Sequence, residues 1–188
     1  MRSLYQVAAA IALVMLAAAP VRAESFISPF IGFNFGGDSA NCASLRECEE
    51  KRANFGVSVG TRRGIFGFEQ DIGYARDFFG KTPGADNAVL TVMSNLMVVI
   101  PAGPIHPYGI VGIGLIRPHV QLDLASLASN QNALGYDIGG GLNIFLLHSV
   151  GIRGDVRRLK TVNDITLPLF SNEKLEFWRG SVGVTLRF

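Results

Sequence analysis

Apolar and polar residues alternate along the last eleven positions of the chain, residues 178–188. The bulky apolar residues share one parity: Trp178, Val182, Val184, Leu186 and Phe188. The residues between them are small or polar, and a period of two is typical of a β-strand with two different faces. A row of large apolar groups is rarely left in water, whereas a bilayer accepts it if the polar face lines a barrel. The segment therefore predicts a membrane-spanning strand.

The same period recurs in seven earlier segments, which gives eight predicted strands. They are residues 27–35, 53–61, 65–75, 88–100, 108–116, 134–146, 150–158 and 178–188. Two of them are imperfect. Phe30 breaks the alternation of the first segment, and the fifth changes phase, because Tyr108 and Ile110 have one parity and Val111 the other. A β-bulge within residues 109–112 is one explanation for the change of phase.

The segments that join these strands alternate between short and long. Residues 62–64, 101–107 and 147–149 are short, whereas residues 36–52, 76–87, 117–133 and 159–177 are long and mostly polar. Short turns on one side and long loops on the other are typical of outer-membrane barrels. Both termini then lie on the periplasmic side. We expect residues 122–127, which mix apolar and small polar side chains, to extend two strands above the membrane.

A soluble lipocalin-like barrel or sandwich also alternates, but its apolar face points inward. Here the apolar face is bulky, and the polar face consists of Gly, Ser, Asn and charged residues that suit a narrow interior. The pattern therefore favours an all-β fold, an eight-stranded antiparallel transmembrane up-and-down β-barrel.

The amino-terminal segment predicts export. Arg2 precedes an apolar run over residues 7–19, and Val21 and Ala23 offer small residues to a signal peptidase. The run is too short for a membrane anchor. We predict a signal peptide over residues 1–23, cleaved after Ala23, and one barrel domain over residues 24–188 in the outer membrane of a Gram-negative bacterium.

Charge excludes one class of partner. The chain has 17 Lys and Arg against 15 Asp and Glu, and removal of Arg2 and Arg22 leaves a formally neutral domain. A neutral domain without a basic patch is not expected to bind nucleic acid. Apolar composition with 22 glycines fits a barrel with an oily outside and a crowded interior.

The predicted inward face carries four acids and four arginines. They are Glu69, Asp71, Asp137, Arg153, Asp155, Arg157, Arg179 and Arg187. Each would cost about 2–4 kcal/mol facing lipid at the bilayer midplane. We therefore expect a salt-bridge network that fills the lumen, because eight strands leave room only for side chains. A gated or proton-conducting path through the network is the functional alternative.

Catalysis has weak support in the sequence. Lipid-modifying barrels use Ser, His and acid arrangements, and the three histidines here are His106, His119 and His148. His106 and His148 fall in predicted periplasmic turns, and His119 near the outer rim has Asp123 as a nearby acid. We expect no enzyme activity, no cofactor and no metal site.

Two cysteines, Cys42 and Cys48, lie close together in a polar loop of a chain predicted to be exported, which predicts a local disulfide. Free thiols remain the alternative. The long loops are the expected functional surface, with host surfaces, lipopolysaccharide or other envelope components as candidate partners.

Four stretches resemble bacterial outer-membrane β-barrel-domain proteins of the OmpA/OmpX-like superfamily. They are residues 67–75, 107–115, 151–157 and the ending at 178–188. The resemblance spans essentially all of residues 24–188 and is specific for the barrel type rather than for an activity. It implies that Phe188, with Trp178 and Leu186, belongs to a signal read by the barrel assembly machinery. The expected function is a structural or surface-interaction role of a monomeric outer-membrane protein. A narrow channel for small solutes is the alternative, and a lipid-modifying enzyme a distant one.

Overall fold

The computed structural model describes residues 23–37, 39, 52–78, 85–122, 127–130, 132–162, 165–167 and 170–188. Apart from Ala23, the predicted signal peptide lies outside these described residues. So do Cys42 and Cys48, so the signal peptide and the disulfide stay predictions. No helix in the described ranges is long and apolar enough to cross a membrane.

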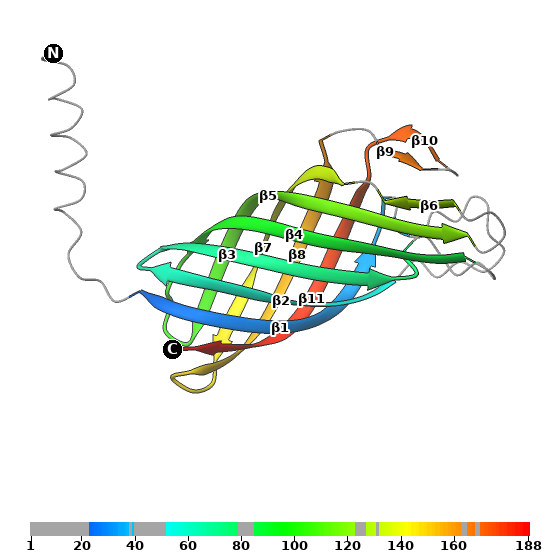
Figure 1. Cartoon of the computed structure of the whole chain (residues 1–188). Coiled ribbons are helices and arrows are strands. Elements are labelled where there is room, and N and C mark those ends of the chain that lie inside the picture. The colour runs from blue at the N-terminus through cyan, green and yellow to red at the C-terminus, as the bar shows by residue number, and fades with distance from the viewer. Residues whose placement is uncertain are drawn as a thin grey trace, which may run out of the picture.

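Eight strands form a closed antiparallel barrel (Figure 1). They are β1 (Glu24–Phe35), β2 (Arg52–Arg63), β3 (Phe66–Arg76), β4 (Ala85–Val99), β5 (Ile105–Leu122), β7 (Ala133–Phe145), β8 (Val150–Thr161) and β11 (Glu176–Arg187). The order around the barrel is β4-β3-β2-β1-β11-β8-β7-β5, and pairing of β4 with β5 closes the sheet. Closure leaves no unpaired edge, which a bilayer requires because it offers no water to backbone groups. The predicted fold class is confirmed.

The two ends of the barrel differ. Tight turns join β2 to β3, β4 to β5 and β7 to β8 at one end, here named the short-turn end. The first two contain Gly64 and Gly103 at φ angles of 64° and 65°, a conformation that favours glycine. The first and last strands meet at this end, where Ser25 and Phe188 exchange backbone hydrogen bonds of 3.0 and 2.9 Å. The opposite end is named the long-loop end.

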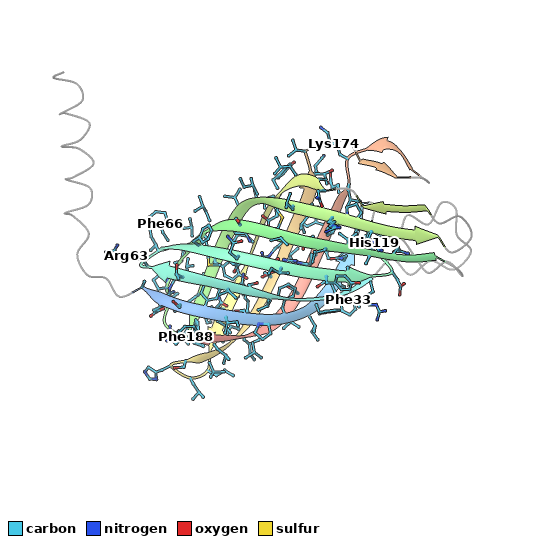
Figure 2. All side chains as sticks on the ribbon, in the orientation of Figure 1. Phe33, Arg63, Phe66, His119, Lys174 and Phe188 are labelled. Atoms are coloured by element: carbon cyan, nitrogen blue, oxygen red, sulfur yellow. The ribbon has the colours of Figure 1, made fainter. Side chains whose placement is uncertain are left out.

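The outer wall is apolar, as the alternation predicted. Large apolar residues of one parity are exposed on every barrel strand, among them Ile31, Leu96, Ile113 and Val182. Outward-facing aromatic residues gather towards the two ends: Phe33, Phe35, Phe55, Tyr74, Tyr136 and Trp178 towards the long-loop end, and Phe66, Phe68 and Phe188 towards the other. Figure 2 shows Phe33 and Phe66 at opposite ends. Aromatic girdles of this kind mark the two membrane interfaces.

The fifth strand contains no bulge. β5 keeps an unbroken register with β4 and with β7 through Gly109 and Gly112. Tyr108 and Ile110 are buried and Val111 is exposed, so the apparent change of phase comes from apolar residues that point into the lumen. Phe30 of β1 is also buried inside. The bulge explanation is therefore wrong: the interior holds large apolar groups as well as charges.

Three strands continue beyond the barrel at the long-loop end. β4 pairs with β5 as far as Ala85 opposite Leu122, and the short β6 (Leu127–Asn130) pairs with the outer part of β5. Residues 123–126 of the expected extension lie outside the described residues, and the strands on either side of them extend to Leu122 and Leu127 as expected. A second hairpin, β9 (Ile165–Leu167) with β10 (Phe170–Glu173), lies between β8 and β11 in sequence. Both features are visible in Figure 1.

Candidate functional site

Charged side chains from four strands meet in the middle of the lumen. They are Glu69 and Asp71 of β3, Asp137 of β7, Arg153, Asp155 and Arg157 of β8, and Arg179 of β11, and all seven are buried. Three strands separate β3 from β8 in either direction around the barrel. Salt bridges between β3 and β8 therefore cross the lumen.

Arg157 is the centre of this group. Its Nη2 lies 3.0 Å from Glu69 Oε1 and 3.0 Å from Asp155 Oδ2, and its Nη1 lies 3.3 Å from Asp71 Oδ2. The side chain is fully buried. A buried guanidinium without anions would cost several kcal/mol, and three carboxylates around one side chain offset that cost. Arg157 therefore ties β3 to β8 across the barrel.

Arg153 makes a second crossing towards the short-turn end. Its Nη1 donates to Glu69 Oε2 at 2.5 Å, and its Nε lies 2.7 Å from the Tyr108 hydroxyl and 3.1 Å from Asp155 Oδ2. The Tyr108 hydroxyl donates to Asp155 Oδ2 at 2.8 Å. Tyr108 also presents its ring to the Arg153 guanidinium, 4.7 Å from the centroid, so it supports both charges.

Arg179 makes the crossing nearest the long-loop end. Its Nη2 donates to Asp71 Oδ1 at 2.6 Å, and its guanidinium lies 4.9 Å from the centroid of the Phe30 ring. Ser58 donates to the other oxygen of Asp71 at 2.8 Å. The sequence did not identify Phe30, Ser58 and Tyr108 as part of this network. For the two aromatic residues, an inward parity within their strands was the available signal.

Asp137 is the exception among the acids. Its carboxylate is buried, and neither oxygen accepts a hydrogen bond within the described part of the chain. Its nearest cation is Arg157, whose Nη1 lies 3.7 Å from Oδ2. Asn95 Oδ1 also lacks a donor there, while Asn95 Nδ2 donates to Glu69 at 3.2 Å. Four carboxylates thus face three guanidiniums, and Asp137 carries the surplus charge.

Arg187 does not join the network, which corrects one predicted member. Its Nη1 lies 3.6 Å from Glu24 Oε2, and its Nε donates to the backbone carbonyl of His148. Its guanidinium carbon lies over the Phe145 ring, 4.2 Å from the centroid. Arg187 has the same inward parity as Arg179. However, eight residues place it about 26 Å further along the strand, at 3.3 Å per residue. It therefore belongs to the short-turn mouth.

Apolar clusters cover the charged layer on both sides. Towards the short-turn end, Met97, Val99, Tyr108 and Ile110 pack together with Phe26. Towards the long-loop end, a larger cluster contains Ala75, Phe78, Val89, Met93, Ile116, Ala133, Leu159, Leu175 and Phe177. Within it, the Phe78 and Phe177 rings pack edge to face at 4.8 Å. The lumen is therefore layered: apolar, charged, apolar.

Two small cavities lie inside the described part of the barrel. One of about 30 Å³ lies at the short-turn mouth beside Arg62 and His106, and one of about 10 Å³ lies near Asn54 and Phe177. A cavity needs about 10–15 Å³ of this kind of volume to hold one water. Among the described residues, these spaces give no room for a hydrated solute to pass.

The three histidines lie at different places. His106 is at the short-turn mouth, where its Nε2 lies 3.0 Å from the Gly103 carbonyl and its Nδ1 3.1 Å from Arg62 Nη1. These contacts fit a neutral ring whose Nε2 donates and whose Nδ1 accepts, so Nδ1 is already occupied. His148 is exposed in the turn after β7, and His119 lies at the opposite end of the barrel (Figure 2). The histidines are not brought together into one site.

The chemistry that these side chains can perform is limited. In the described ranges, no three His, Cys, Asp or Glu side chains are placed to hold a metal. Glu69, Asp71 and Asp155 are bound to arginines, so their oxygens are occupied rather than free for acid or base chemistry, and Asp137 is the exception. The arrangement of the charged layer suits mechanical locking of opposite walls.

The residues of the implied assembly signal all face outwards. Trp178 and Leu186 are exposed on the wall of β11, and Phe188 has 78% of its surface exposed. The backbone of Phe188 pairs with Ser25 at the β1–β11 seam. The recognition of these residues by an assembly machine stays a prediction.

A closed eight-stranded barrel with an apolar wall and a filled lumen is the architecture of a family of outer-membrane proteins. The family model described as outer membrane protein beta-barrel domain matches residues 8–188. The chain belongs to this family. Its place is therefore the outer membrane of a Gram-negative bacterium, where the short-turn end is periplasmic and the long-loop end extracellular. A comparison with curated protein sequences finds no match.

Several solved barrels are similar to this chain. Neisserial surface protein A is 18% identical, with a TM-score of 0.66 over 88% of this chain and 99% of its own. Ail, the attachment invasion locus protein of Yersinia pestis, is 11% identical, with a TM-score of 0.57 over 88% and 98%. The amino-terminal barrel domain of Pseudomonas aeruginosa OprF is 14% identical, with a TM-score of 0.54 over 88% and 97%. At such identities the likeness shows the fold alone.

Proposed function

We propose that this outer-membrane barrel is a surface-interaction protein whose closed barrel anchors an extracellular binding surface. The observation that supports the proposal is the combination of a filled lumen with strands that continue past the barrel. β4, β5 and β6 form a three-stranded extension at the extracellular end, up to the Leu122–Leu127 pair. A sheet extension holds loop residues at a fixed height and orientation, which favours recognition of a partner.

The names of similar barrels agree with this role. One neighbour is named a surface protein and another an attachment invasion locus protein. A further Ail structure holds sucrose octasulfate, a heparin analogue, and is 13% identical to this chain with a TM-score of 0.55. Sulfated glycans are accordingly one class of partner to try first.

A channel is the weaker candidate. Hydrated ions would have to pass Arg157 and both apolar clusters, and the internal cavities are about 30 and 10 Å³. An opening would require removal of buried ion pairs from their partners, at several kcal/mol for each ion.

Shortening the extension tests the proposal. Replacement of residues 120–129 by Asn-Gly joins the paired residues His119 and Asn130 through a two-residue turn that suits a hairpin. Replacement of Leu147 and His148 by Asn and Gly in the periplasmic turn is the matched control. Each variant is expressed in a strain lacking the protein, and its surface level is checked by heat-modifiable migration of the membrane fraction.

Attachment to immobilised heparin and to extracellular-matrix proteins is then measured beside detergent resistance. We expect the shortened variant to assemble normally but to attach no better than the strain lacking the protein, while the turn control attaches normally. Normal attachment of the shortened variant would contradict the proposal. A second result would also contradict it. If the strain lacking the protein is defective only in detergent resistance, and the shortened variant restores that resistance, the role is envelope integrity.

A further inference from the structure

The outer wall of the barrel contains a hollow built from outward-facing glycines. Gly140 of β7, Gly154 of β8 and Gly180 of β11 lie on neighbouring strands, with Val156 opposite both Gly140 and Gly180. A Cβ at Gly154 would meet described atoms only at 4.0 Å, and one at Gly180 only Phe35 at 3.5 Å. The missing side chains leave an almost wholly apolar groove of about 1030 Å³.

Aromatic side chains form one wall of the groove and carry it towards the extracellular end. Phe33 of β1 lies opposite Gly180, and Phe35 lies opposite Trp178, one outward position higher on β11. Phe55 of β2 extends the same wall. A groove between bulky rings and glycine backbone, facing lipid, has the shape of a slot for an acyl chain.

Basic side chains lie directly above the groove. On the outward face of β8, Arg158 and Lys160 follow Val156 in steps of two residues, about 6.6 Å each. Arg158 Nη2 lies 2.5 Å and Lys160 Nζ 2.8 Å from the Glu176 carboxylate. Two cations share this one carboxylate, so the cluster keeps a net positive charge. The exposed Lys174, seen at the same end in Figure 2, adds another.

We propose that this groove and its basic rim bind one lipid A moiety of lipopolysaccharide, with an acyl chain along Gly154 and Gly180 and a phosphate at Arg158 and Lys160. The position selects this occupant, because the groove rises to the extracellular rim, where the outer leaflet carries phosphorylated lipid A. A second copy of the chain fits poorly. A two-fold contact would place groove against groove and cations against cations. The site is on the barrel wall and does not depend on the loop role proposed above.

Trp178 gives a direct reporter of this site. It is the single tryptophan of the chain, it pairs with Arg158, and it lies next to Gly180 on the outward face of β11. Bromine atoms on lipid chains quench tryptophan fluorescence at short range. The purified full barrel is therefore placed in bilayers of dibrominated phosphatidylcholine, which quench Trp178, and unlabelled lipid A or phosphatidylglycerol is added as competitor.

We expect lipid A to relieve the quenching at a several-fold lower mole fraction than phosphatidylglycerol. Replacement of Arg158 or Lys160 by Gln lowers the affinity for lipid A by roughly fivefold for each cation near an anionic lipid surface, and Gly154→Leu fills the groove and removes the preference for lipid A. Gly109→Leu and Arg117→Gln, on the outward face of β5, are the matched controls and keep the wild-type preference. Heat-modifiable migration shows that each variant is folded.

Three results would overturn the proposal. Equal relief by lipid A and phosphatidylglycerol would make the groove an ordinary lipid contact. Wild-type behaviour of the Gly154→Leu variant would place any preference elsewhere. Absence of quenching in brominated lipid alone would show that protein, such as a second copy, covers Trp178.

Discussion

The surplus carboxylate in the lumen leads to an unusual expectation for mutations of buried acids. Asp71 accepts 2.6 Å and 2.8 Å hydrogen bonds from Arg179 and Ser58 and lies 3.3 Å from Arg157. Asp137 accepts none within the described part of the chain, and its nearest guanidinium atom is 3.7 Å away. The two acids are equally buried, so their variants separate the effect of burial from that of pairing.

Asp71→Asn leaves Arg179 without its carboxylate. Removal of one partner from a buried pair costs about 3–5 kcal/mol, because the other charge stays buried and uncompensated. Asp137→Asn keeps the shape, balances the core at three acids against three arginines, and supplies an amide that can donate to Asn95 Oδ1. Relief of an unsatisfied buried polar group is worth about 1–3 kcal/mol. We therefore expect Asp137→Asn to be neutral or stabilising.

Equilibrium unfolding in urea, with the barrel in phospholipid vesicles at neutral pH, measures the free energy of unfolding of each variant. Trp178 fluorescence and heat-modifiable migration follow the same transition. If Asp137→Asn destabilises the barrel as strongly as Asp71→Asn, the surplus-charge reasoning is refuted.

Further predictions concern packing, the tyrosine and the seam. Gly112→Ala should lower the free energy of unfolding by about 1–3 kcal/mol through overpacking, because its Cβ would overlap Asn95 Oδ1. Outward-facing Gly109→Ala should be nearly neutral. Urea unfolding compares the two variants, and equal stabilities would contradict the tight packing around Gly112. Tyr108→Phe should lose about 1.5–3 kcal/mol, the value for hydrogen bonds to charged groups, and an unchanged unfolding midpoint would contradict its bridging role. Phe188→Ser should lower the amount of assembled barrel while export continues, measured by membrane fractionation, and normal assembly would weaken the implied signal.

The alternation of apolar and polar residues, the alternating loop lengths and the predicted signal peptide all point to the same fold. Together they were sufficient to predict the barrel. It assigned Glu69, Arg157 and their neighbours to the interior because a charged residue of inward parity has no stable place in lipid. The same rule left the direction of Phe30, Tyr108 and Ile110 open, and the structure places all three inside. An apolar residue is stable on either face of the wall, so its type alone does not reveal its direction.

The position of a residue along the barrel axis was the second property that the sequence pattern did not provide. Parity assigned Arg179 and Arg187 to one face, but salt bridges also need both partners at one level of the lumen. That level depends on strand tilt and on the stagger between neighbours, which are properties of the closed sheet. The glycine groove was missed for a related reason. Gly140, Gly154 and Gly180 become neighbours through the register of three strands, and nothing in their local sequence places them together.

Charged and apolar layers close the lumen in the described part of the barrel, which is the basis of our proposal that the protein acts through its surfaces. Conductance of the purified full-length barrel in planar bilayers measures whether the lumen is closed. We expect no channel steps above background in concentrated KCl, even with several copies inserted. Regular steps that scale with salt concentration would contradict a closed lumen, because ions would then be crossing the layer held by Arg157.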